Sequence, residues 1–276
     1  MKDQKSLVVA LILITMSLTA TAQISLAPSF VFLDANTGVG NLYISNNGTQ
    51  AQEVTISFLF GYPGSDSEGN LVMRYDDSAA FKQYGLDSMI RAFPRSFTLN
   101  GGEQRTVRIQ VIPAAQQKDG FFFTRLKVLA KPLSAEVSQQ TTEGISTRIS
   151  FNFEQITAVF YHKGKVRTGL KVEKTETFQK EKQLEVRAHL VPQGNAPYIG
   201  SMFAKIKDNQ GKVLAESEAT TTAYFPVIRN ISLNTEGIAP GTYTLELCFE
   251  TRRNDMAATD LVQAPRIVHE TQVMIR

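Results

Sequence analysis

Few residues of this chain have the types and the spacing that chemistry requires. The three histidines, His162, His189 and His269, lie far apart, and none has a second ligand at the spacing of a zinc site. The pair Asp76 and Asp77 has no further ligands clustered around it, so a turn or a helix cap is favoured over a metal site. No Gly-x-Ser-x-Gly nucleophile motif occurs. The sequence therefore predicts a non-enzyme without catalytic residues, bound metal or cofactor.

The only cysteine lies in an alternating stretch, YTLELCFE. The apolar residues of this stretch share one face: Tyr243, Leu245, Leu247 and Phe249. Cys248 lies on the other face beside Glu246 and Glu250, so we expect a partly exposed thiol without a catalytic role. A single cysteine cannot form an internal disulfide, and stability must therefore come from the packing of sheets.

The elements expected to position these residues are almost all β-strands. Alternating apolar and polar residues recur along both halves, separated by turn sequences such as NNG and NGG. Strands are expected in the first half at 24–33, 40–46, 53–60, 88–93, 104–112, 121–131 and 145–161. Strands are expected in the second half at 166–173, 184–191, 198–207, 212–225, 228–233, 242–251 and 266–275. This pattern predicts an all-β fold of two tandem immunoglobulin-like β-sandwiches.

The polar stretch HKGKVR, residues 162–167, is the expected boundary between the sandwiches. We expect domains at 23–163 and 164–276, each with its own core, joined by a short hinge. Residues 66–86 interrupt the strand pattern. This insertion either shapes a surface for a partner or is an insertion that the fold merely tolerates. Within it Asp77 is expected to cap a short helix over 78–84, with Gly85 as its left-handed end.

Residues 1–22 have the pattern of a secretory signal peptide. Lys2 and Lys5 precede an apolar run at 7–18, and residues 20–22, ATA, resemble a cleavage site. The run is short for a membrane span, and no other stretch approaches about 20 apolar residues. We therefore expect a cleaved leader and a soluble protein in the periplasm, or at the cell surface, without stable insertion into a membrane.

The charge of the chain excludes one class of partner. The 276 residues carry a formal net charge of +3 without a basic cluster. This balance argues against nucleic acid and gives no strong signal for a membrane surface.

The last expected strand of the first half changes its pattern midway. In ISTRISFNFEQITAVFYHKG, residues 145–154 alternate, with Ile149, Phe151 and Phe153 on one apolar face. From Ile156 to Tyr161 both faces are mostly apolar. This change predicts a strand whose second part is buried on both sides.

Several stretches of the first half resemble successive strands of the PapD-like periplasmic pilus-assembly chaperones. They are ISLAPSFVFLDANTGVGNLYISNNGTQAQEVTISF, FPRSFTLNGGEQRTVRIQVIPA, FFFTRLKVLAKP and ITAVFYHKG. The resemblance covers most of residues 24–163 outside 66–86. The second half is only generically immunoglobulin-like, with APGTYTLEL as its best piece.

The resemblance implies a mechanism for the last strand. Such chaperones bind a subunit that lacks a strand and supply it by β-strand addition. Aligned on FY at residues 160–161, the donor residues fall on Ile149, Phe151 and Phe153, and 156–161 would stay in the chaperone's own core. The alternative from the pattern alone is that these three side chains face the first domain's own core.

One feature of the family is missing. Its members anchor the subunit's terminal carboxylate with one basic residue on the first strand and another on the last. The matching positions here are Phe30 and Ala158, and Lys163, Lys165 or Arg167 are the candidate replacements. The resemblance thus implies a chaperone-like protein that binds pilin-like or secreted protein subunits. A structural or adhesive component of a cell-surface assembly is the alternative.

Overall fold

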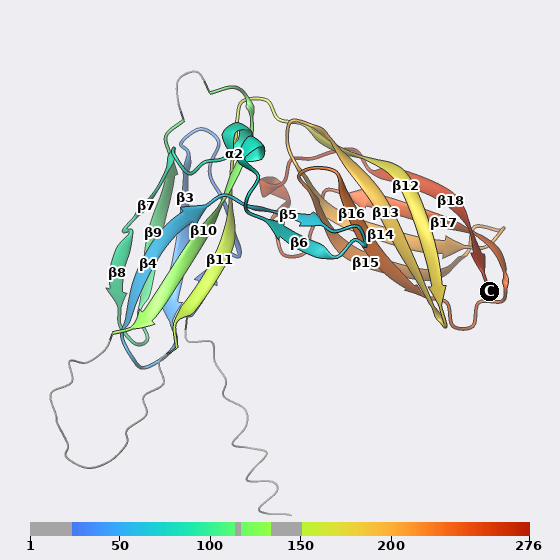
Figure 1. Cartoon of the computed structure of the whole chain (residues 1–276), viewed down its shortest axis with the longest axis horizontal. Helices are drawn as coiled ribbons and strands as arrows, with labels where there is room; N and C mark the ends of the chain where they lie inside the picture. Colours follow the sequence, from blue (N-terminus) through green and yellow to red (C-terminus); the bar gives the residue numbers. More distant parts are fainter. Residues whose placement is uncertain (1–23, 114–116, 134–150) are drawn as a thin grey trace, which may run out of the picture.

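The chain folds into two β-sandwiches that lie side by side (Figure 1). The computed structural model describes residues 24–113, 117–133 and 151–276. The first sandwich and its insertion contain β1 (Ile24–Ala27), β2 (Phe30–Phe32), β3 (Val39–Asn46), β4 (Gln52–Leu59), β5 (Tyr62–Ser65), β6 (Leu71–Arg74), α2 (Ser78–Tyr84), β7 (Ile90–Phe93), β8 (Ser96–Leu99), β9 (Gln104–Val111), β10 (Gly120–Pro132) and β11 (Phe153–Lys163). The second contains β12 (Thr168–Lys180), β13 (Gln183–Gly194), β14 (Tyr198–Lys207), β15 (Val213–Ala223), β16 (Val227–Asn234), β17 (Gly241–Glu250), the short turn η1 (Ala258–Asp260) and β18 (Ile267–Ile275). The predicted all-β fold of tandem sandwiches is confirmed.

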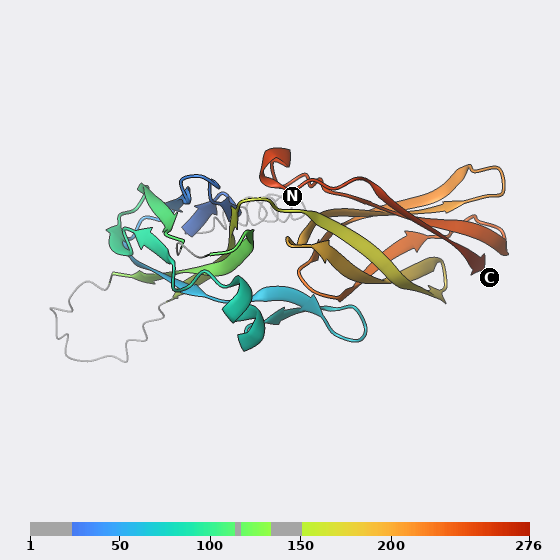
Figure 2. The same ribbon diagram turned by 90° about the horizontal axis from the view of Figure 1, so that it is seen from above.

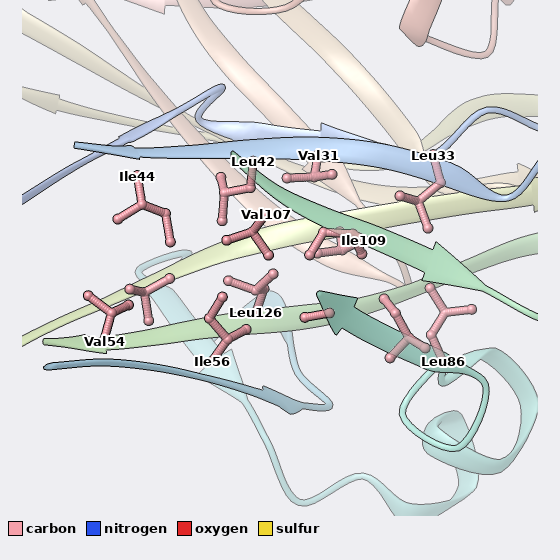
Figure 3. Close-up of a cluster of buried hydrophobic side chains, with 14 of the residues drawn as sticks. Val31, Leu33, Leu42, Ile44, Val54, Ile56, Leu86, Val107, Ile109 and Leu126 are labelled. Atoms are coloured by element: carbon pink, nitrogen blue, oxygen red, sulfur yellow. The ribbon is translucent and has the colours of Figure 1, made fainter. Parts of the chain in front are cut away.

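The first sandwich forms because alternate residues of its strands are apolar. One sheet has the order β1-β3-β9-β7 and the other β2-β11-β10-β4-β8. Leu42 and Ile44 of β3 and Ile109 of β9 face Leu126 of β10 across the interior, and all four are fully buried (Figure 3). Truncating a buried Leu or Ile to Ala costs about 2–5 kcal/mol. This core holds β10 in place, and β10 in turn holds β11.

The stretch expected as one strand at 24–33 is divided between the two sheets. β1 pairs with β3 antiparallel, and after a break at 28–29 β2 pairs with β11 parallel. Val31 and Leu33 still reach the core of the first sandwich. The crossing leaves only three residues, Phe30–Phe32, to pair with β11.

The second sandwich is built in the same way. Its sheets have the orders β12-β13-β16 and β15-β14-β17-β18. Tyr198, Phe249 and Leu184 are among its largest fully buried side chains. Because no sheet of the described residues contains strands from both halves, we propose the boundary between residues 163 and 164.

The insertion at 66–86 differs partly from its prediction. Its residues 71–74 form β6, which pairs with β5 just before the insertion in an unexpected hairpin. The helix α2 is present over Ser78–Tyr84 with Asp77 as its cap, since the Asp77 carboxylate accepts a hydrogen bond from the Ala80 amide. The prediction for Gly85 was wrong: its φ is −71° and its ψ is 145°, which is extended backbone.

A third apolar cluster joins the two halves, although separate cores were predicted. Phe60, Phe121 and Phe123 from the first half are buried together with Ile199 and Leu261 from the second. The polar hinge gave no sign of this cluster, because most of its members come from β10, β14 and loops far from 162–167 in sequence, and the nearby Ala158 and Phe160 are buried by those distant residues. The two sandwiches therefore share an apolar interface.

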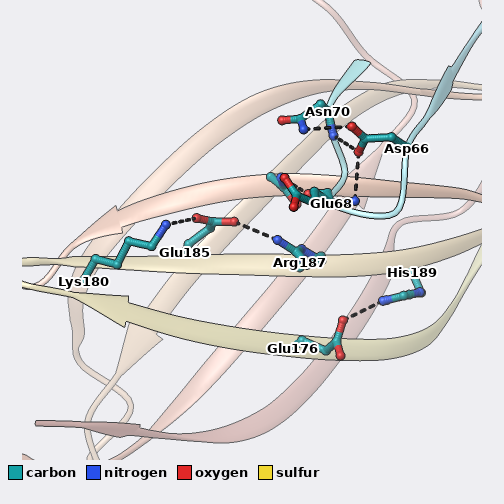
Figure 4. A network of polar contacts seen from close by, with 9 residues as sticks. Asp66, Glu68, Asn70, Glu176, Lys180, Glu185, Arg187 and His189 are labelled. Carbon is teal, nitrogen blue, oxygen red and sulfur yellow. Dashed lines mark hydrogen bonds and ion pairs between the residues drawn. The ribbon is translucent and has the colours of Figure 1, made fainter. Parts of the chain in front are cut away.

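The outer edge of the second sandwich carries a polar network on β12 and β13 (Figure 4). Lys174 Nζ donates to Glu176 Oε1 at 2.7 Å, and His189 Nε2 lies 2.9 Å from Glu176 Oε2. These two hydrogen bonds lower the pKa of Glu176 from 4.5 to about 2, and the bond from Lys174 is the larger cause. The carboxylate is therefore better stabilised in the folded than in the unfolded chain.

Replacing Glu176 with glutamine is expected to reduce the acid sensitivity of the protein. A lowered folded-state pKa adds stability above pH 4.5 that is lost as the pH falls toward about 2. Between these values the melting temperature of the Glu176→Gln protein should fall less steeply than that of the wild type, as measured by circular dichroism. Glu173→Gln is the control on the same strand, because Glu173 Oε1 lies 4.0 Å from Lys171 Nζ, which is too far for a hydrogen bond. Equal acid slopes for Glu176→Gln and wild type would contradict the assignment.

Within the ranges that the structure describes, no helix is long and apolar enough to cross a membrane.

Candidate partner-binding edge

The strand β11 is paired along its whole length on one side only. β10 pairs with all of it, from Phe153 to Lys163. On the other side β2 pairs only with residues 158–160. Among the described residues, no strand pairs with 153–157 on that side. The segment before β2 contacts this stretch through a side chain, since the Thr157 hydroxyl donates a hydrogen bond to the Ser29 carbonyl. These five residues form a free edge, the 153–157 edge.

The backbone groups that face this edge can be identified from one hydrogen bond. The Leu33 amide donates to the Phe160 carbonyl at 2.8 Å, so the backbone groups of Phe160 face β2. Because backbone groups alternate sides along a strand, those of Glu154 and Ile156 face the same side, beyond the end of β2. Their N–H and C=O groups are therefore free to pair with another strand.

The side chains of β11 divide between two interiors. Phe153, Val159 and Tyr161 pack on the core of the first sandwich. Ala158 and Phe160, on the opposite face, are buried in the cluster between the sandwiches. This accounts for the two apolar faces of the second part of the strand.

The prediction that 156–161 is buried was wrong at its first residue. Ile156 is 37% exposed. It shares a face with Ala158 and Phe160, but it lies beyond the region that the second sandwich covers.

The structure separates the three predicted donor residues. Phe151, which lies just before β11, is 68% exposed. Phe153 is half-buried and packs against the first sandwich, as the alternative prediction held for this residue. Ile149 lies outside the described residues, as do the predicted signal peptide and the start of the strand expected at 145–161, which begins only at Phe153. The apolar face thus passes from the domain's own core at Phe153 to solvent at Phe151.

A further exposed apolar residue at this end of the sheet was missed. Leu133 directly follows β10 and is 55% exposed. Ala130 of β10 is opposite Phe153, so the end of β10 lies beside the start of β11. The sequence did contain a signal for it, because Leu133 is an apolar residue between the end of an expected strand and the mostly polar stretch that follows. Exposed apolar side chains at this end of the sheet are thus Ile156 within the 153–157 edge, Phe151 just before it, and Leu133 after the neighbouring strand β10.

The two positions at which the resemblance implies a basic pair are directly opposite each other. Phe30 pairs with Ala158 in the parallel register of β2 and β11. A guanidinium lies there nevertheless, because Arg253 of the second sandwich lies over the Phe30 ring at 5.3 Å from its centroid. Asp255 holds it in two hydrogen bonds of 2.8 and 2.5 Å, and these lower the pKa of Asp255.

The candidate replacements for that basic pair have different environments. Lys163 Nζ donates to the Gln117 carbonyl at 2.8 Å. Lys165 and Arg167 are exposed and are held through their backbone amides, which donate to Asp119 Oδ2 and Asn195 Oδ1 respectively. The side chains of Lys165 and Arg167 extend from the boundary segment, and their binding of a carboxylate stays a prediction.

The thiol of Cys248 is more buried than expected. It is 2% exposed, although it does lie on the face of β17 opposite the core. Arg266 covers it, with Nε 2.8 Å from Sγ. The alternation of apolar and polar residues predicted the correct face for Cys248. It could not show that the Arg266 side chain, just before β18, covers the thiol. In the part of the chain that is described, no group of three or more His, Cys, Asp or Glu residues could hold a metal ion.

Comparison with known proteins yields similarity in structure only. No protein-family model matches the sequence, and no curated protein matches it. Among solved structures, the chain is similar to the YadV chaperone, with 11% identity, a TM-score of 0.46, and coverage of 92% of this chain and 100% of the other. It is also similar to the Pseudomonas aeruginosa CupB2 chaperone (12% identity, TM-score 0.41, 89% and 98% coverage). The Escherichia coli chaperone DraB is a third (13% identity, TM-score 0.42, 82% and 89% coverage). At these identities each likeness is one of strand arrangement alone.

Proposed function

We propose that this protein is a non-enzymatic, periplasmic chaperone-like protein that binds incomplete protein subunits by β-strand addition. The partner is a pilin-like or secreted subunit whose sheet lacks a strand. β11 supplies that strand through its 153–157 edge, and apolar side chains at and before this edge fill the partner's groove.

The observation that carries the proposal is the free edge itself. Unpaired edges are sites of unwanted association, and proteins usually protect them with charged residues, especially lysine. The edge strand β12 is protected in this way by Lys171, Lys174 and Lys180. The 153–157 edge has a single charged side chain, Glu154, which lies 3.4 Å from Lys127 of the neighbouring strand. Its lack of protection favours a strand that is meant to be paired.

The energies available at this edge are adequate for binding. Each backbone hydrogen bond to a partner strand contributes about 0.5–1.5 kcal/mol net. Burying an exposed side chain such as Phe151 contributes about 1.5–3 kcal/mol. Backbone pairing therefore supplies affinity for any strand, while the exposed Phe151 selects a groove of matching shape.

Replacing Ile156 with proline tests the pairing of the backbone. Proline removes the N–H of residue 156, which faces the free edge and has no strand partner there within 24–113, 117–133 and 151–276. The free protein should keep its fold, and its affinity for the subunit should fall roughly 2- to 10-fold for the lost hydrogen bond. The measurement is capture of subunits from an extract of the native host, with captured proteins identified by mass spectrometry, alongside a thermal melt.

Gln155→Pro is the matched control, because the backbone of Gln155 faces β10 and its loss breaks a bond of the existing sheet. This variant should lower the melting temperature. Undiminished capture by a folded Ile156→Pro protein would contradict strand addition at this edge. Recovery of a complete, stable assembly in place of an unfinished subunit would favour a structural or adhesive component.

A further inference from the structure

The β5–β6 hairpin leaves the first sandwich and lies against the second. Figure 1 shows it crossing the gap between them, and Figure 2 shows it on the side opposite η1. Among the described residues its strands pair only with each other, so the hairpin belongs to neither sheet of the first sandwich. The position of this hairpin therefore requires a separate explanation.

Three consecutive residues of β16 bind the hairpin by hydrogen bonds. The Ile228 amide donates to Ser65 Oγ at 2.8 Å. Arg229 Nη1 donates to the Gly64 carbonyl at 3.4 Å, and its Nη2 donates to the Thr222 carbonyl of the second sandwich at 2.7 Å. Asn230 Nδ2 donates to the Glu68 carbonyl at 2.7 Å. The contact is thus polar and directional, which sets one position of the hairpin along β16.

The tip of the hairpin fits closely on β16. Gly69 has a φ of +83°, which favours glycine. A Cβ atom at this position would also lie 2.4 Å from Asn230 Oδ1, so a side chain here would displace the Asn230 amide from its place beside the turn. The turn therefore favours glycine here, and the absence of a side chain lets Asn230 lie against the tip of the hairpin.

Aromatic rings hold the base of the hairpin. The Tyr62 ring is 4.7 Å from that of Phe225 and 5.9 Å from that of Tyr224, both on the second sandwich. Tyr62 Oη donates to Asp77 Oδ2 at 2.6 Å, which connects the hairpin to the N-terminal cap of α2. Tyr84 of α2 then contacts Phe225 at 5.7 Å. The hairpin and α2 form one contact surface for the second sandwich.

We propose that the β5–β6 hairpin is a strap that keeps the two sandwiches at one fixed angle. The loop around η1 supports the opposite side, where Leu261 is buried in the shared cluster. Contacts on two sides of the interface oppose a hinge motion in either direction. The inference goes beyond the proposed function, because it concerns the free protein and holds whether or not a subunit binds.

A distance measurement between the two sandwiches tests the strap. Spin labels are attached at Thr98→Cys and Gln210→Cys, two exposed positions on different sandwiches, in a full-length chain carrying Cys248→Ser. Pulsed electron paramagnetic resonance should give one narrow distance distribution. Adding Ser65→Ala and Asn230→Asp removes two of the hydrogen bonds and places a carboxylate against the Glu68 carbonyl, and the distribution should broaden at least about twofold.

Two further variants keep the test decisive. Asn234→Asp is the control on the same strand, since Asn234 Oδ1 accepts from the Glu236 amide and an aspartate can still accept that bond. It should leave the distribution narrow. If the double variant does not fold, Ser65→Ala alone should still give measurable broadening. A broad distribution in the parent protein, or a narrow one in a folded double variant, would overturn the proposal.

Discussion

Replacing Phe151 with aspartate is expected to abolish subunit capture while leaving the free protein as stable as before. Phe151 is 68% exposed, so its replacement removes little buried surface. Surface substitutions usually change stability by less than about 0.5 kcal/mol, which for a chain of this size shifts the melting temperature by about 2 °C or less. A thermal melt should therefore barely distinguish the variant from the wild type.

The effect on binding should be large for two reasons. The variant loses the burial of a phenylalanine, about 1.5–3 kcal/mol, which alone lowers affinity roughly 10- to 150-fold. It also places a charge without a partner in an apolar groove, which adds a further penalty. The capture assay described above should then recover no subunit.

Two aspartate controls separate an exposed binding residue from a core residue. Ile112→Asp changes an equally exposed apolar side chain, 65% accessible, at the end of β9, and it should alter neither capture nor melting. Phe153→Asp places a charge against the first core and should lower both. An unfolded Phe151→Asp protein, or a folded one that captures subunits at full strength, would refute the proposed donor strand.

The second half of the chain, expressed alone as residues 166–276, is expected to fold but to be clearly less stable than the whole protein. It retains its own core, in which Tyr198, Phe249 and Leu184 are buried. It loses the cover over Ile199 and Leu261, which are buried against the first half. At about 1.5–3 kcal/mol for each large apolar side chain, the loss is roughly 3–6 kcal/mol. The melt should stay cooperative, with a midpoint roughly 10 °C or more below that of the full chain.

Phe225→Ser provides the matched comparison. In the full chain it removes the ring contacts to Tyr62 and Tyr84 and should lower the melting temperature. In the isolated half the same ring has no partner from the first sandwich, so the substitution should have little effect. An unfolded fragment would mean that the second half depends on the first, and a fragment as stable as the whole protein would mean that the shared cluster contributes nothing.

Much of the fold could be predicted because local patterns depend on local physics. The two-residue period of a half-buried strand identifies which side chains share a face, and the strands of the second half were all expected. The N-cap at Asp77 was predictable too, since its hydrogen bond reaches only three residues along the chain. The wrong prediction at Gly85 shows the limit of such signals. Glycine can adopt the left-handed conformation, but it adopts the extended conformation as well, so its presence after a helix does not decide between them.

By itself the sequence determined the all-β class, the faces of its strands and the apolar character of Phe151 and Phe153. Only the tertiary structure decided which of these faces is covered, and by what. The exposure of Ile156, the burial of Cys248 under Arg266 and the shared cluster between the sandwiches all depend on residues distant in sequence. The 153–157 edge exists because β2 pairs with only three residues of β11. The periodicity of a strand shows which side chains share a face, but it does not show which other strands pair with it. Strand pairing is a contact between residues distant in sequence, so a free edge can be identified only from the tertiary structure.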